Sequence, residues 1–274
     1  MSIRRIFFTS LLFSYLSFTC CTDSKTENTK KNINEIADKI HFENVIYSIR
    51  NTVNMQLSTI SSSLEPSVFA RIQNAADDAF NVGLMKSDFK NYLTQKSDSL
   101  DINNFIKWLN SPLYNKINKC EIRVLNDQDY SEINSYAKLI KSDSSLYKRY
   151  LFISSSMRHE EIELTADAYA ATFRTLVEAS RRFVDRTRLM KDSDIDYMVQ
   201  SERDGFIKNL QNDAIFEKLF RYKNLSDDEL ISIVEFKHSP TGKNASVFVH
   251  KAILYAVEQA NHDFLNRVSK INSW

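Results

Sequence analysis

The chain has 274 residues, of which 43% are hydrophobic, so it is long enough to bury a substantial core. Its 36 basic and 35 acidic residues nearly balance, which argues against a nucleic-acid-binding protein, because phosphate neutralisation needs a clustered excess of Lys and Arg. Only 3 Gly and 3 Pro occur, where ordinary usage would give about 19 and 14. So few turn residues exclude most hairpin-rich and glycine-loop folds, and we predict an all-α fold.

The N-terminus has the pattern of an export signal. Arg4 and Arg5 precede an uncharged apolar run that is shorter than the about 20 residues needed to span a bilayer. The run ends at Cys20 and Cys21, and a cysteine at this place resembles the lipid-modified residue of bacterial lipoproteins. We predict a signal peptide over residues 1–20 and a lipid anchor on Cys21, with Cys20 as the alternative site. Simple cleavage and an uncleaved anchor stay open as alternatives.

This signal implies a location. Cleavage removes two of the 36 basic residues and leaves 34 against 35 acidic ones. Residues 21–32 are rich in Thr, Lys and Asn and are predicted to form a flexible tether from a membrane. The expected location is the bacterial cell envelope, with the protein lipid-anchored and facing the periplasm. Cys120 is then left without a disulfide partner, and a buried, inert thiol is preferred over a nucleophile.

Helical periodicity begins after the tether. One helix is predicted from about residue 33 to residue 60, and a second from Pro66 to Gly83, which would cap its end. Ser87 is predicted to open a short helix together with the Asp that follows it. Ser99 or Asp101 is predicted to open the next helix.

One apolar phrase occurs twice, at a constant offset. Further apolar positions match between the two halves, with a single insertion in a polar loop. We predict a helical bundle of two pseudo-repeats of about four to five helices each, over residues 33–128 and 161–274. A helical connector is predicted over 129–160, with helices near 136–140 and 146–157. The alternative is a chance alignment of amphipathic helices. The repeated phrase is Ile102, Phe105, Ile106 and Trp108 before Ser111-Pro112, then Leu230, Ile233, Val234 and Phe236 before Ser239-Pro240.

Each Ser-Pro pair is predicted to form a corner between two helices. Proline disfavours helical backbone in the residue before it, so the first helix must stop at Ser111 or Ser239. The Ser hydroxyl can then cap the next helix, while Pro112 or Pro240 takes its first position. The aromatic residue three positions before each Ser is expected to anchor the corner in the core.

The corner sequence resembles a known family. An apolar helix ending in an aromatic residue, then Ser-Pro-x-Gly-Lys and a second helix, is similar to the bacterial domain-of-unknown-function family number two thousand and fifty-nine. The match is close from Phe236 to Lys243, where Gly242 stands at the glycine position, whereas the first copy has Tyr114 there. The resemblance implies an exported helical protein and transfers no activity.

Charged residues near the middle of the chain are one candidate site. His159, Glu160 and Glu163 partly match a helical zinc protease, which needs a second His on the helix and a third ligand. A solvated charged face is the preferred interpretation. A basic cluster near the end of a long helix is explained by the helix dipole, with a contact to acidic lipid or a partner protein as a second use. This cluster is Arg181, Arg182, Arg186 and Arg188.

Two further groups are candidates for ligand binding. His250, Glu258 and His262 are spaced along the last helix, and exposed positions are preferred over a metal site. Each corner also places a helix N-terminus near Lys116 or Lys243, which could hold an anion such as a lipid headgroup. Capping alone also explains those residues.

These patterns lead to a hypothesis about function. We expect a non-catalytic binding or scaffold module without cofactor or metal, which binds an envelope protein, a peptide or a lipid in a groove between the two halves. The alternatives are a metal-dependent envelope hydrolase that uses His159, Glu160 and Glu163, and a structural spacer. A wide cleft lined from both halves would favour ligand binding, and a closed bundle would favour a scaffold.

Overall fold

The computed structural model is all-helical, as predicted, and has no strand in the residues that it describes. The predicted signal peptide and both candidate lipid-attachment sites, Cys20 and Cys21, lie outside the described residues. No helix in the described part of the chain is long and apolar enough to cross a membrane. The described ranges are 27–60, 64–99, 101–123, 127–183 and 191–271.

The predicted tether over residues 21–32 overlaps a helix. Residues 27–39 are helical, and Ile33 and Ile36 on this helix are buried. Residues 27–32 of the predicted tether are thus the first turns of a helix rather than an irregular segment, whereas the buried Ile33 and Ile36 lie beyond the predicted tether, in the predicted first repeat. The rest of the predicted tether lies outside the described residues.

After this first helix the chain forms a series of helices joined by short turns. They are α2 (Phe42–Ile60), α3 (Pro66–Ala79), α4 (Val82–Gln95), the short 3-10 helix η2 (Ser97–Ser99), α5 (Ile102–Leu109), α6 (Pro112–Glu121), α7 (Asp127–Leu139), α8 (Ser144–Ser156), α9 (His159–Arg181), α10 (Asp192–Arg221), α11 (Asp227–His238) and α12 (Pro240–Val268).

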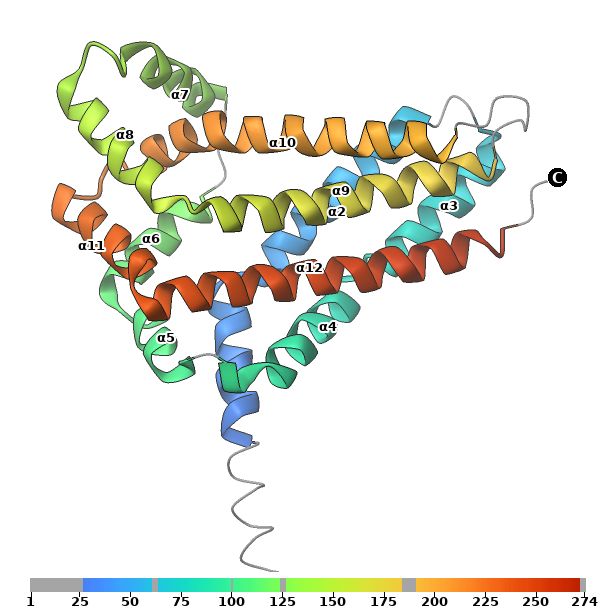
Figure 1. Ribbon diagram of the computed structural model, residues 1–274, viewed down its shortest axis with the longest axis horizontal. Helices are drawn as coiled ribbons and strands as arrows, with labels where there is room; N and C mark the ends of the chain where they lie inside the picture. The colour runs from blue at the N-terminus through green and yellow to red at the C-terminus, as the bar shows by residue number, and fades with distance from the viewer. Residues whose placement is uncertain (1–26, 61–63, 100, 124–126, 184–190, 272–274) are drawn as a thin grey trace, which may run out of the picture.

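The long helices α9, α10 and α12 form one layer, in which α9 lies between the other two (Figure 1). α2, α3 and α4 cover one side of this layer, with α3 and α4 against α12 and α2 against α9. α5, α6, α7, α8 and α11 gather at one end of the long helices, where the two Ser-Pro corners lie.

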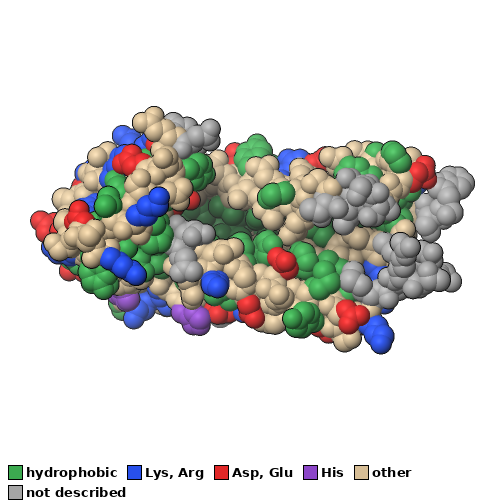
Figure 2. Space-filling model, turned by 90° about the horizontal axis from the view of Figure 1, so that it is seen from above, with side chains coloured by type: hydrophobic (Ala, Val, Ile, Leu, Met, Phe, Trp, Pro, Cys, Tyr) green, Lys and Arg blue, Asp and Glu red, His purple; other side chains and the backbone are tan. Residues whose placement is uncertain are grey.

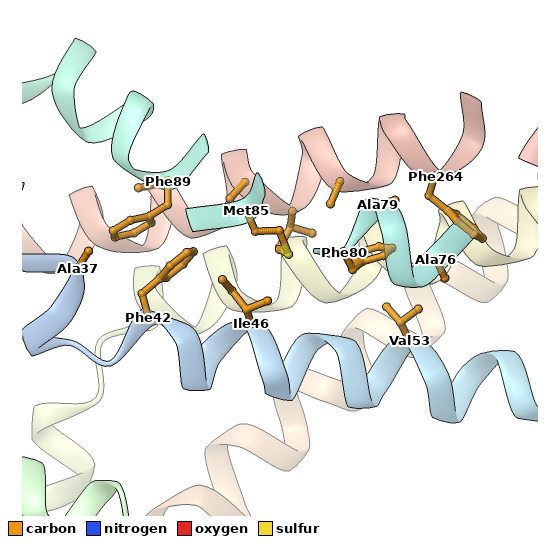
Figure 3. Packing of buried hydrophobic residues seen from close by; sticks show 14 of the residues in the cluster. Ala37, Phe42, Ile46, Val53, Ala76, Ala79, Phe80, Met85, Phe89 and Phe264 are labelled. Atoms are coloured by element: carbon orange, nitrogen blue, oxygen red, sulfur yellow. The ribbon is translucent and has the colours of Figure 1, made fainter. Parts of the chain in front are cut away.

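The larger core fills the space between α2, α3, α4, α9 and α12. Phe42 stacks on Phe89 with ring centroids 4.0 Å apart, and other apolar side chains from these helices interdigitate beside them (Figure 3). The buried side of α12 carries small residues, Ala252, Ala256 and Ala260, which let neighbouring helices lie close to it. A second core joins α6, α8, α10 and α11 at the other end of the molecule.

The helix predicted over residues 33–60 is interrupted. It breaks at residues 40–41, where His41 has a φ of 51°, and α2 starts at Phe42. Positive φ ends a helix, and His is among the residues that adopt it more readily. The hydrophobic pattern continues across the break, so periodicity alone does not reveal it.

The next helix boundary also differs from the prediction. α3 ends at Ala79 instead of Gly83, and Ser87 lies inside α4 rather than at a helix start. Asn81 is the residue that opens α4, because its side-chain oxygen accepts hydrogen bonds from the backbone N–H groups of Gly83 at 2.8 Å and Leu84 at 3.3 Å. Asn is among the strongest N-caps, and it displaces Gly83 into the first turn of α4.

The predicted connector is helical, but its bounds are not helix bounds. α7 and α8 cover the two stretches predicted to be helical within 129–160. Residue 129 lies inside α7 and residue 160 inside α9. α9 follows Arg158, which makes no side-chain cap, so its start has no signal in the sequence.

Helix bounds in the two halves of the chain correspond in part. When the second half is aligned on the first through the two Ser-Pro pairs, α12 covers the span of α6 and α7 together. Before the Ser-Pro pairs, the two halves are aligned through their apolar positions. In that alignment α10 covers the span of α3 and α4 together. One long helix in the second half therefore stands where the first half has two shorter ones.

Candidate functional site: a cavity between two Ser-Pro corners

Both Ser-Pro pairs form the predicted corner. Ser111 caps α6 by accepting a hydrogen bond from the N–H of Tyr114 at 3.1 Å, and Ser239 caps α12 by accepting one from the N–H of Gly242 at 3.0 Å. Pro takes the first helical position in each case. The first corner joins α5 to α6, and the second joins α11 to α12.

At the second corner α11 and α12 lie too close together for an alanine in place of Gly242. A Cβ on Gly242 would lie 1.9 Å from the carbonyl oxygen of Phe236 and 3.1 Å from the Cα of Lys237. The glycine therefore lets the start of α12 touch the end of α11. The first corner has Tyr114 at the matching position, and the hydroxyl of this tyrosine donates to the carbonyl of Lys39 at 3.1 Å.

The two corners face each other. Trp108, from α5, stacks on Phe236, from α11, with ring centroids 4.0 Å apart and ring planes within 7°. These are the aromatic residues that precede the two Ser-Pro pairs, so residues at matching places in the two corners touch each other.

A cavity of about 390 Å³, here called the corner cavity, lies between the two corners. For each residue of α5 and α6 in its wall, the residue 128 positions later, on α11 or α12, also lies in the wall. The pairs are Phe105 with Ile233, Trp108 with Phe236, Leu109 with Lys237, Tyr114 with Gly242, Ile117 with Ala245, Asn118 with Ser246 and Glu121 with Val249. The walls of this cavity therefore come from both Ser-Pro corners, at matching sequence positions.

The wall of the corner cavity contains two lysines, each paired with a glutamate. The ammonium of Lys237 donates to Glu161 at 3.1 Å, and that of Lys218 donates to Glu121 at 2.9 Å. Tyr222 donates its hydroxyl to the same Glu121. An ammonium has three donors, and Lys237 makes one hydrogen bond within the described part of the chain. Two donors of Lys237 therefore remain for a ligand or water.

The two lysines differ in their electrostatic surroundings. Burial lowers the pKa of Lys237, and the positive charge of Lys218 lowers it further, against the opposing effect of Glu161. The pKa of Lys218 is raised by Tyr222 and Glu121. Burial works to raise the pKa of Glu121, but Lys218 and Tyr222 outweigh it and hold that pKa low.

His250 also belongs to the wall of the corner cavity. Its Nδ1 lies 2.8 Å from the backbone carbonyl oxygen of Ser246. A carbonyl oxygen only accepts, so Nδ1 carries the proton and Nε2 is left as an acceptor. Burial lowers the pKa of His250, which keeps the ring neutral at pH 7.

His250 also belongs to the wall of a second cavity of about 390 Å³, here called the long cavity. The long cavity lies between α2, α9, α10 and α12, and Val45, Ile49, Leu164, Ile253 and Val257 supply much of its wall. The space-filling view shows that one face of the molecule is hollowed, with hydrophobic side chains in the hollow (Figure 2).

The residues considered for a zinc-protease site form ion pairs instead. Glu163 binds the guanidinium of Arg203, and His159 lies 3.4 Å from Glu163 with 77% of its side chain exposed. Glu160 pairs with Arg158 at 3.2 Å. Across the described ranges there is no group of three or more His, Cys, Asp or Glu that could hold a metal ion.

His250, Glu258 and His262 do not share one face. Glu258 and His262 are exposed, as preferred, but His250 is half-buried in the cavity walls, so the prediction of an exposed position is wrong for His250. A spacing of eight residues turns a helix by about 80° beyond two full turns. This turn separates His250 from Glu258.

The remaining candidates lie outside the cavities. Lys116 pairs with Glu229 at 2.7 Å, and Lys243 is exposed beyond the second corner. Cys120 is a half-buried thiol whose pKa is raised by burial, as expected for an inert cysteine. Arg181 ends α9 and pairs with Asp192, whereas residues 186 and 188 of the basic cluster lie outside the described residues.

The charged residues of the corner cavity were not predicted as a site. Lys237 follows Phe236 of the second corner, and Glu161 follows Glu160 of the zinc-protease candidate. Because 76 residues separate Lys237 from Glu161, no local sequence pattern predicts that they form a pair. Lys218 and Glu121 have no local signal at all. Only the folding of α9 and α10 against the corners brings these groups together.

Comparison of the chain with protein-family models, with curated proteins and with solved structures finds no match.

Proposed function

We propose that this protein is a binding module that holds an anionic group of its ligand in the corner cavity, beside the ammonium of Lys237. The observation that carries this proposal is the free donors of Lys237 in the wall of a cavity of about 390 Å³. Cavities of about 300–1,000 Å³, mostly apolar with a few polar groups, are typical of small-molecule sites. A role in binding is supported over one as a scaffold, since a closed bundle would have no such cavity.

We further propose that the two halves are diverged copies of one helical unit, and that the site lies on the pseudo-twofold axis between them. At such an axis, equivalent residues contact each other, as Trp108 and Phe236 do. The contacts between the halves also come in matching pairs. α3 and α4 of the first copy pack on α12 of the second. In the same way α10, which corresponds to α3 and α4, packs on α7, which corresponds to part of α12. On this basis the first copy extends through α7 to about residue 140, and the connector shrinks to α8.

The proposed setting is the cell envelope. The apolar N-terminal run that ends at Cys21 and the Ser-Pro-x-Gly corner at Gly242 support an exported, lipid-anchored protein of the helical family that the corner resembles. A ligand within reach of a membrane-anchored protein is then an envelope component.

The test uses a fluorescent sulfonate, anilinonaphthalene sulfonate, as the anionic probe. Lys237→Gln removes the positive charge but keeps an N–H donor for Glu161, and we expect the affinity for the probe to fall about tenfold or more, because hydrogen bonds to charged groups contribute about 1.5–3 kcal/mol. Lys243→Gln is the matched control, since Lys243 is exposed and outside the cavity wall. Absence of saturable binding, or equal binding by both variants, would overturn the proposal.

A further inference from the structure

We propose that the ligand is a single-chain anionic amphiphile, with its head group in the corner cavity and its alkyl chain in the long cavity. This inference rests on the proposed function, and it adds the second cavity and the class of ligand. Three features carry it: the two cavities adjoin, the wall of the second is mostly apolar, and the lysines lie at one end only.

The two cavities follow each other along one trough. His250 belongs to both walls, and on α12 the wall residues run from Ser246 through His250 and Ile253 to Val257. This stripe extends over about 16 Å of helix at 1.5 Å per residue. On α9, Glu161 hydrogen-bonds Lys237 of the corner cavity, and the long cavity begins one turn further on.

Three threonine hydroxyls in the wall of the long cavity hydrogen-bond within their own helices. Thr165 donates to the backbone carbonyl of Glu161 at 2.8 Å, Thr172 to that of Ala168 at 3.0 Å, and Thr52 to that of Ser48 at 3.1 Å. The protons of these three hydroxyls are therefore not available to a ligand. The wall is therefore more apolar than its composition indicates, and it suits an alkyl chain.

Two stacked aromatic residues belong to the wall of the long cavity. Tyr169 stacks on Phe206 with ring centroids 4.3 Å apart and planes within 6°. The tyrosine hydroxyl accepts from Gln56 at 3.3 Å and donates to Glu202 at 3.2 Å. Both hydrogen-bonding roles of this hydroxyl are thus filled by protein groups, so it offers little to a polar ligand.

The charges are distributed unevenly along the trough. Lys218, Lys237 and Glu121 line the corner cavity, and no Lys, Arg, Asp or Glu is among the described wall residues of the long cavity. His250, at the junction, is neutral at pH 7 for the reason given above. A ligand with an anionic head and an apolar tail matches this arrangement in one orientation only, with the head beside Lys237.

The first experiment measures affinity against chain length. Trp108 lies in the wall of the corner cavity, and Trp274→Phe removes the other tryptophan, so the remaining fluorescence reports on this cavity. We expect the affinity to rise about fourfold for each methylene from hexanoate to octanoate to decanoate, the gain for burying a methylene group. Lauryl phosphate and laurate distinguish a phosphate head from a carboxylate head, and lauryl alcohol, which has no charge, is expected to bind at least about tenfold more weakly.

A blocking variant shows where the chain lies. Ala168→Phe adds a ring inside the long cavity, and it is expected to abolish the gain in affinity from hexanoate to decanoate. Ser201→Phe, which adds the same ring at an exposed position of α10, is the matched control and is expected to behave like the unaltered protein.

A second measurement does not depend on any blocking variant. Bromine quenches tryptophan fluorescence on contact, so we compare laurate brominated next to the carboxylate with laurate brominated at the far end. The proposal expects strong quenching of Trp108 by the first and weak quenching by the second. The reverse order would overturn it.

The outcomes separate the two proposals. If hexanoate binds in a Lys237-dependent way but longer chains gain nothing, the ligand is a small anion, and the amphiphile inference fails while the proposed function stands. If long chains bind and Lys237→Gln has no effect, both fail, because the head group is then not held by the corner cavity. If Ser201→Phe loses chain-length dependence as Ala168→Phe does, the long cavity is not the site of the chain.

Discussion

Replacing Gly242 by alanine is the sharpest test of the second corner. The new Cβ would lie 1.9 Å from the carbonyl oxygen of Phe236 and 2.7 Å from its carbonyl carbon, whereas real Cβ contacts are essentially never below 3.0 Å. Both atoms belong to the backbone, so no side-chain rotation can relieve the overlap. α11 and α12 must move apart by about 1 Å.

The expected cost follows from two opposing effects. Overpacking a close contact typically costs about 1–3 kcal/mol, and a clash with backbone belongs at the upper end of this range. Alanine favours a helix over glycine by up to about 1 kcal/mol, but Gly242 lies in the first turn of α12, where this gain is smaller. We expect Gly242→Ala to lower the free energy of unfolding by about 2–3 kcal/mol.

Gly205 provides a matched control. It lies in the interior of α10, and beyond the adjoining backbone of its own helix no described atom lies within 4 Å of a Cβ placed there. Gly205→Ala is therefore expected to raise the free energy of unfolding by about 0.5–1 kcal/mol. The measurement is equilibrium unfolding in urea, followed by far-ultraviolet circular dichroism. If both substitutions stabilise the protein to the same extent, the close approach of α11 and α12 at Gly242 is wrong.

Further predictions concern the cap, the aromatic stack and the histidine of the site. Ser239→Ala removes the cap of α12 and is expected to cost about 1 kcal/mol in urea unfolding, whereas an unchanged value would mean that the cap contributes nothing. In a double-mutant cycle of Trp108→Leu and Phe236→Leu, we expect a coupling energy of about 0.5–1.5 kcal/mol, and simple additivity would contradict the stacking. Burial lowers the pKa of His250 in the folded state below its ordinary value of 6.5, so the unfolded chain takes up a proton first as the pH falls. Stability should therefore decrease from about pH 6.5 down to the folded pKa, with a slope of at most about 1.4 kcal/mol per pH unit for this group. The charged groups around this ring are Glu161, Lys237 and Arg158, and they remain in His250→Gln. This variant is expected to show a smaller slope, and an identical slope would assign the acid sensitivity to another residue.

Helix boundaries could be predicted where a single residue restricts the backbone or caps a helix end. The corners were predictable because Pro restricts its predecessor and Ser caps the next helix, both of which are interactions within a few residues. The helix break at His41 and the start of α4 at Asn81 were not predicted, because the hydrophobic period runs on through both. Whether the chain breaks between two helices at such a point depends on how the second helix packs in the core. The hydrophobic period does not contain this information.

The helical class, the two capped corners and the apolar phrase before Ser111 and Ser239 could be read from the order of the residues alone. The contact between Trp108 and Phe236, the pairing of Lys237 with Glu161, and the place of His250 in two adjoining cavities became known only from the packed helices. Caps and helical periods arise from neighbours within a turn, whereas a cavity arises from the shapes of distant helices, whose mutual positions depend on every contact in the core.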